Sequence, residues 1–123
     1  MTSIMVINAK GGSGKTTIST NLAAYYAYAD FNVTLVDLDP QNSALNWLSS
    51  RPITKPKIKG VSSLPPQKVS RKLNDVTIFD VPAAIYGPRL ETYIKKARKI
   101  IIPVLPSPID MAAAKDFLKS IRN

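Results

Sequence analysis

Nine residues near the amino terminus combine glycines, lysines and hydroxyls in a spacing that suits phosphate chemistry. Residues 9–17 read AKGGSGKTT, between an apolar stretch at residues 4–7 and a segment with helical spacing. Glycines let backbone N–H groups approach an anion closely, and a helix that begins near Lys15 adds unpaired N–H groups and the positive end of its dipole. Lys15 is expected to bridge the β- and γ-phosphates of a nucleotide, and the Thr16 hydroxyl to bind Mg²⁺. The alternative is a glycine-serine turn with a solvated lysine.

The whole loop is expected to contact the nucleotide. Its predicted binding residues are Lys10, Gly11, Gly12, Ser13, Gly14, Lys15, Thr16 and Thr17.

Three aspartates stand at the ends of two other apolar segments. Asp37 and Asp39 follow residues 33–36, and Asp80 follows residues 76–79. Ligands of open α/β sheets bind at the edge where the parallel strands end, so these carboxylates are predicted to share an edge with the glycine loop. The second segment is also a plausible Walker B strand, whose terminal acid orders the water shell of Mg²⁺.

The remaining pattern alternates strand-like and helical segments, which predicts an α/β fold: a P-loop NTPase with a parallel sheet flanked by helices. One domain over residues 1–123 is expected. Strands are predicted at residues 4–8, 33–36, 58–61 (weak), 76–79 and 100–102, and helices at residues 15–29, 43–48, 89–97 and 108–120, with a helical turn at 67–74. Ser107, Pro108 and Asp110 are typical of a helix N-terminus and predict the start of the last helix. The Trp47 side chain is expected to pack against the fold rather than to have a functional role.

Charge and composition narrow the function classes. The chain has 17 Lys and Arg against 8 Asp and Glu, a formal charge of +9, and no cysteine. Zero cysteine fits a reducing cytoplasm and excludes disulfides, thiolate metal sites and iron–sulfur relatives. No apolar run approaches the roughly 20 residues that span a bilayer. Basic residues gather at residues 51–72 and 95–99, where they either attract nucleic-acid phosphates or form a solvated surface.

Four motifs occur in the order found in one known family. The loop has Ala9 at the usual first glycine and Lys10 directly before Gly11, a K-G-G-x-G-K-T-T form. Residues 37–41 read DLDPQ, residues 80–84 read DVPAA and residues 100–110 read IIIPVLPSPID. Together they resemble the ParA/MinD family of deviant Walker A ATPases, and most closely its small partition-type ParA proteins.

The resemblance implies roles for single residues. Lys10 would reach across a dimer to the partner's ATP, so Lys10, Lys15 and Asp39 are the expected catalytic residues. Asp39 would place or activate the attacking water near Mg²⁺, while Asp37 would hold the ion through water or fix the loop. The expected metal-binding residues are Thr16, Asp37, Asp39 and Asp80.

The resemblance also implies a cellular role. ATP and Mg²⁺ would drive homodimerisation, and the dimer would hold DNA non-specifically until a ParB-like adaptor stimulates hydrolysis. Such a protein positions plasmids or other cargo in the cytoplasm, on the nucleoid and without a membrane. Relatives continue beyond the helix after the fifth strand, so the chain is expected to be short at its C-terminus. A non-hydrolysing P-loop module, a MinD-like ATPase on a membrane surface and a dethiobiotin-synthetase-type ligase remain alternatives.

Overall fold

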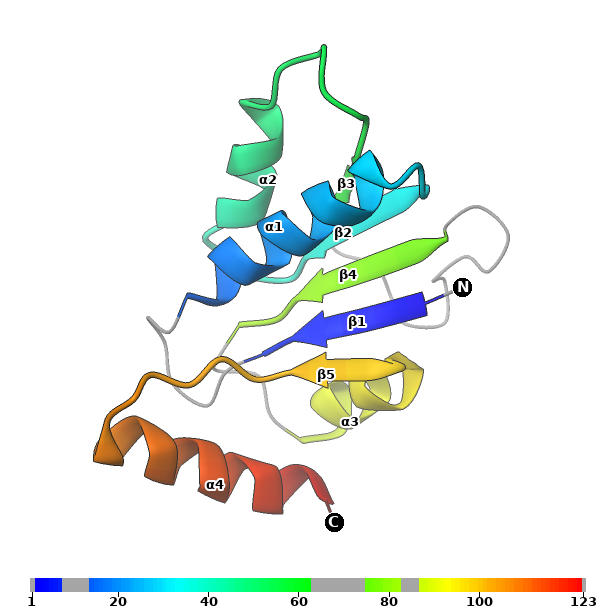
Figure 1. Cartoon of the computed structure of the whole chain (residues 1–123). Coiled ribbons are helices and arrows are strands. Elements are labelled where there is room, and N and C mark those ends of the chain that lie inside the picture. Colours follow the sequence, from blue (N-terminus) through cyan, green and yellow to red (C-terminus); the bar gives the residue numbers. More distant parts are fainter. Residues whose placement is uncertain (1, 8–13, 63–74, 83–86, 123) are drawn as a thin grey trace.

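The computed structural model describes residues 2–7, 14–62, 75–82 and 87–122 (Figure 1). Its strands are β1 (Thr2–Val6), β2 (Val33–Asp37), β3 (Lys59–Val61), β4 (Val76–Asp80) and β5 (Lys99–Ile101). Its helices are α1 (Lys15–Tyr28), α2 (Ser43–Ser49), α3 (Gly87–Lys96) and α4 (Pro108–Arg122). The predicted helical turn at residues 67–74 lies outside the described residues.

The five strands form one parallel sheet in the order β3-β2-β4-β1-β5. In register, Asp80 of β4 lies beside Val6 of β1 on one side and Asp37 of β2 on the other. The carboxyl ends of the three central strands therefore meet at one edge, which confirms the predicted α/β architecture. β5 pairs with β1 alone among the described strands, so the fifth strand lies at the edge of this sheet.

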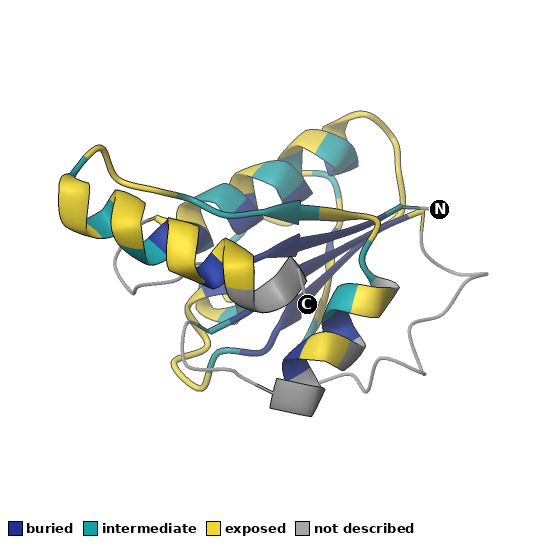
Figure 2. Cartoon of the chain, turned by 90° about the horizontal axis from the view of Figure 1, so that it is seen from below, coloured by how far each residue is buried: buried dark blue, intermediate teal, exposed yellow. Residues whose placement is uncertain are grey.

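Apolar side chains are buried on both faces of the sheet. Strand residues such as Ile4, Leu35 and Ile78 pack with Ala23 and Ala27 of α1 and Ala44 of α2. On the other face Met5, Val36 and Phe79 pack with Leu90 and Tyr93 of α3 and Phe117 of α4. Figure 2 shows α1 and α3 on opposite sides of the buried strands. Burial on both faces explains why the strands read as continuous apolar runs.

The buried stripe of α1 differs from the apolar spacing expected there. Small residues at four-residue intervals, Ser19, Ala23 and Ala27, lie against the sheet, while Tyr25 is 66% exposed. The small side chains let the helix axis approach the sheet closely, which turns the adjacent tyrosine outward. Large apolar residues therefore flank the contact, where Leu22 and Tyr26 pack only partly.

The element boundaries follow from pairing. β1 covers Thr2–Val6 in place of residues 4–8, because it pairs with β4 from Thr2 opposite Val76 onward.

At the predicted start of α4, the Asp110 N–H donates to the Ser107 hydroxyl over 3.1 Å, and that hydroxyl donates to the Asp110 carboxylate, which confirms the N-terminal cap. In the described part of the chain, no helix is long and apolar enough to cross a membrane.

Candidate phosphate-binding site

The helix α1 begins in a way that aims its N-terminus at the carboxyl edge of the sheet. Gly14 has φ +84°, a left-handed conformation that favours glycine, and its carbonyl accepts the Ile18 N–H over 3.1 Å. Lys15 is thus the first helical residue, as predicted, and its side chain is buried beside the sheet. The positive end of the helix and the Lys15 cation lie at the same place.

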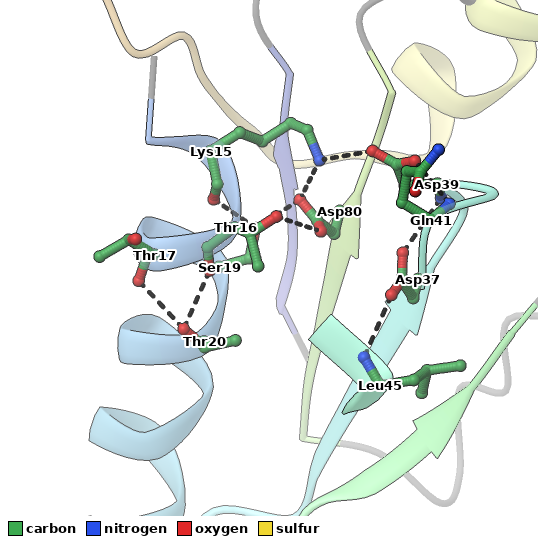
Figure 3. A network of polar contacts seen from close by, with 10 residues as sticks. All are labelled: Lys15, Thr16, Thr17, Ser19, Thr20, Asp37, Asp39, Gln41, Leu45 and Asp80. Carbon is green, nitrogen blue, oxygen red and sulfur yellow. Dashed lines mark hydrogen bonds and ion pairs between the residues drawn. The ribbon is translucent and has the colours of Figure 1, made fainter. Parts of the chain in front are cut away.

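Asp80 is the centre of a polar cluster at this edge (Figure 3). Its Oδ1 accepts Lys15 Nζ at 2.5 Å and the Ser19 hydroxyl at 3.0 Å, and its Oδ2 accepts the Thr16 hydroxyl at 3.2 Å. The Asp80 side chain is fully buried. A carboxylate without water needs such donors, so α1 and β4 are held together by an ion pair and two hydroxyl contacts.

Asp37 is buried but faces the loop after β2. One carboxylate oxygen accepts the Asp39 N–H at 3.0 Å and the other accepts the Leu45 N–H at 3.1 Å. Burial raises the pKa of the Asp37 carboxyl, and the two backbone N–H donors oppose that shift. The contacts join the end of β2 to the first turn of α2, which supports the loop-fixing interpretation of Asp37.

Asp39 lies between Lys15 and solvent. Its Oδ1 accepts the Gln41 N–H at 3.0 Å, which fixes the carboxylate, and its Oδ2 lies 3.7 Å from Lys15 Nζ. The Asp39 side chain remains 24% exposed, unlike Asp37 and Asp80. An oriented and partly exposed carboxylate beside the Lys15 ammonium can orient a water molecule.

The structure therefore brings together the start of α1, the end of β2 with the loop after it, and the end of β4, which carry Lys15, Thr16, Asp37, Asp39 and Asp80. Thr17 points away from this cluster (Figure 3), on the exposed side of α1. The predicted loop residues Lys10, Gly11, Gly12 and Ser13 lie outside the described residues.

Ser19 is a member of the cluster that the sequence interpretation missed. Its hydroxyl oxygen lies 3.0 Å from the Lys15 carbonyl oxygen and 3.0 Å from Asp80 Oδ1, so its single proton is shared between these two acceptors. The spacing could have indicated this role, because Ser19 follows Lys15 by four residues and the two side chains therefore lie on the same face of the helix.

The oxygen donors of the cluster fit a magnesium ion. Thr16 Oγ1 and Asp80 Oδ2 are 3.2 Å apart, close to the ~3.0 Å between neighbouring ligands of an octahedral Mg²⁺ site. Within the described ranges, no group of three or more His, Cys, Asp or Glu side chains is placed so that it could hold a metal ion. This donor set suits an ion that takes one or two protein oxygens and completes its shell with water and phosphate.

The sequence of the chain is similar to a family of nucleotide-binding domains. The profile of the CobQ/CobB/MinD/ParA nucleotide-binding domain matches residues 4–123. Maintenance of carboxysome distribution protein A from Gloeobacter kilaueensis is 34% identical over 89% of the chain, and the protein of the same name from Halothiobacillus neapolitanus is 32% identical over 98%. The chain spans 51% and 58% of the lengths of these two relatives.

A solved structure resembles the fold over 99% of the chain. It is cobyrinic acid a,c-diamide synthase from Mycobacterium smegmatis, with bound ADP and magnesium, at a TM-score of 0.76 and 20% sequence identity. The chain covers 67% of that protein. The likeness confirms the fold of the sheet and its helices.

Proposed function

The chain belongs to the CobQ/CobB/MinD/ParA family of nucleotide-binding domains. We propose that it binds Mg-ATP and hydrolyses it in order to position cargo. The observation that carries the proposal is the convergence of Lys15, Thr16 and Asp80 where α1 begins and β4 ends. Cation, hydroxyl and carboxylate at a helix N-terminus are the groups that hold a Mg-bound triphosphate.

Nucleotide binding requires Lys15 to change partners. Its ammonium group is paired with Asp80 at 2.5 Å, so a phosphate that binds Lys15 competes with this carboxylate. Mg²⁺, when bound, neutralises charge on the phosphate oxygens. The Asp80 carboxylate and Thr16 hydroxyl would hold the ion, and Asp37 would keep the loop of Asp39 in place.

Hydrolysis is assigned to Asp39 and Lys10. Asp39 is oriented by the Gln41 N–H and borders Lys15, so we assign it the placement of the attacking water. Lys10 would act across an ATP-dependent homodimer, where a cation offsets charge that develops on the transferred phosphoryl group. This role rests on the K-G-G-x-G-K-T-T motif.

The names of two relatives support a cellular role in positioning. Two of them are named for maintaining carboxysome distribution, a positioning task. We assign this chain a positioning or partition cycle in which the ATP-bound dimer holds DNA non-specifically and a ParB-like adaptor stimulates hydrolysis. The excess of 17 basic over 8 acidic residues supports contact with DNA. The protein would then act in the cytoplasm, on the nucleoid.

Two alanine variants test the division of roles. Lys10→Ala is expected to bind ATP as a monomer but to lose ATP-dependent dimerisation and turnover, because its cation acts on the partner's nucleotide. Asp39→Ala is expected to dimerise on ATP and to hydrolyse it about a hundredfold more slowly, the usual contribution of a positioned acid–base group. Light scattering with and without ATP, beside phosphate-release assays, measures both.

Identical behaviour of the two variants would contradict these roles. If the unmodified chain binds Mg-ATP but releases no phosphate, the non-hydrolysing alternative is correct.

DNA binding is tested on the basic surface at the end of α3 and in β5. Lys95, Arg98 and Lys99 are exposed there. Lys95→Glu/Lys99→Glu is expected to weaken ATP-dependent binding of duplex DNA and to flatten its salt dependence, because each phosphate contact contributes about one unit to the slope of log K against log salt. An unchanged slope, or no duplex binding at low salt, would mean that these cations only solvate the protein.

A further inference from the structure

A hollow of about 580 Å³ lies between α2 and the segment that leads into β3, and none of Lys15, Thr16 and Asp80 lines it. Figure 1 shows this segment (green, at the top) looping from the end of α2 back to β3, the edge strand beside β2. Apolar side chains that line the hollow include Leu45, Leu48 and Ile58, and three cations, Arg51, Lys55 and Lys57, line it as well. Its volume falls within the range of ordinary binding pockets.

The wall of the hollow is held in place. The Arg51 N–H donates to the Leu48 carbonyl at 3.0 Å, and Arg51 Nε donates to the Pro56 carbonyl at 3.1 Å. The guanidinium carbon lies 5.3 Å from the ring centroid of Trp47 and 5.8 Å from that of Tyr28. These cation–π and backbone contacts tie the segment to α1 and α2, so a ligand would meet a preformed surface.

The charge of the hollow has one sign. Residues 40–74 contain seven lysines and arginines and no aspartate or glutamate. None of the three lining cations is paired with a carboxylate among the described residues. The Lys55 and Lys57 side chains are exposed, so they are available to an external anion, whereas the Arg51 guanidinium is held by the wall of the hollow.

The shape decides which anion fits. A duplex presents rigid phosphate rows and cannot insert an apolar group into a concave floor, whereas a peptide side chain can. The side chain of Ile53, which also lines the hollow, is fully exposed and adds apolar surface beside it. We propose that this hollow docks an acidic peptide segment of a partner protein, with apolar side chains against Leu45, Leu48 and Ile58 and carboxylates against Lys55 and Lys57.

The test uses a defined probe and no nucleotide, so its result is independent of the ATPase proposal. The probe is a fluorescein-labelled peptide with two central leucines flanked on each side by four glutamates, measured by fluorescence anisotropy. Lys55→Glu/Lys57→Glu is expected to weaken binding at least about tenfold, because two attractive contacts become repulsive. The control Lys95→Glu/Lys99→Glu carries the same change in net charge and is expected to weaken binding less than about twofold.

Three further arms complete the test. A peptide with serines in place of the leucines is expected to bind at least about tenfold more weakly, because the apolar floor is then unused. Duplex DNA is expected not to displace the leucine peptide, and both charge variants are expected to keep the melting temperature of the unmodified chain. Absence of saturable binding, equal losses in the two charge variants, equal affinity of the serine peptide, or displacement by duplex DNA would each overturn the proposal.

Discussion

Lys15→Ala is expected to lower the affinity for Mg-ATP by more than about a hundredfold, because it removes charge-assisted contacts to two phosphates worth roughly 1.5–3 kcal/mol each. The Lys15 ammonium is the buried cation at the carboxyl edge of the sheet, 2.5 Å from Asp80. Anisotropy of a fluorescent ATP analogue in the presence of Mg²⁺ measures the loss.

The matched control is Lys115→Ala, which removes an exposed lysine of α4 and is expected to leave the affinity unchanged. Circular dichroism establishes that both variants are folded at the assay temperature. Equal affinities of the folded Lys15→Ala variant and the unmodified chain would show that the phosphates bind elsewhere.

Asp80→Ala is expected to lower the free energy of unfolding by about 3–5 kcal/mol, the usual effect of removing one partner from a buried ion pair. Lys15 would keep a buried charge without its carboxylate, and the Thr16 hydroxyl would lose its acceptor, while the Ser19 hydroxyl would keep only the Lys15 carbonyl. Urea unfolding at neutral pH, in the absence of nucleotide, measures the change.

Two comparisons make the Asp80 result specific. Asp116→Ala, at an exposed position of α4, is expected to change stability by less than about 0.5 kcal/mol. Lys15→Met/Asp80→Ala is expected to recover part of the loss, because no unpaired charge remains. If Asp80→Ala is as stable as Asp116→Ala, the Lys15–Asp80 pair does not hold α1 to β4.

Motifs with a local physical cause were predictable from the sequence. The helix start at Lys15 follows from Gly14, which supplies the left-handed turn, and the cap at Ser107 follows from its spacing to Asp110. The common edge of Asp37 and Asp80 followed from the rule that parallel strands end together, and the register places them side by side.

Features that depend on tertiary contacts were not predictable. The two oxygens of Asp37 find their donors only because α2 folds back over the end of β2 and brings the Leu45 N–H to it. Tyr25 is exposed because small residues bring α1 close to the sheet, a detail that apolar spacing alone does not encode. The position of Arg51 between Tyr28 and Trp47 likewise joins two helices across the fold.

The proposed function depends on the binding of Mg-nucleotide at the edge where Lys15, Thr16 and Asp80 meet. Titration calorimetry of the unmodified chain with ATP, in Mg²⁺ and again in EDTA, measures this binding. Saturable binding of one nucleotide per chain is expected in Mg²⁺, with a clear loss of affinity in EDTA. A folded chain that shows no saturable heat up to ~1 mM Mg-ATP, the weak end of specific binding, would contradict the proposed function.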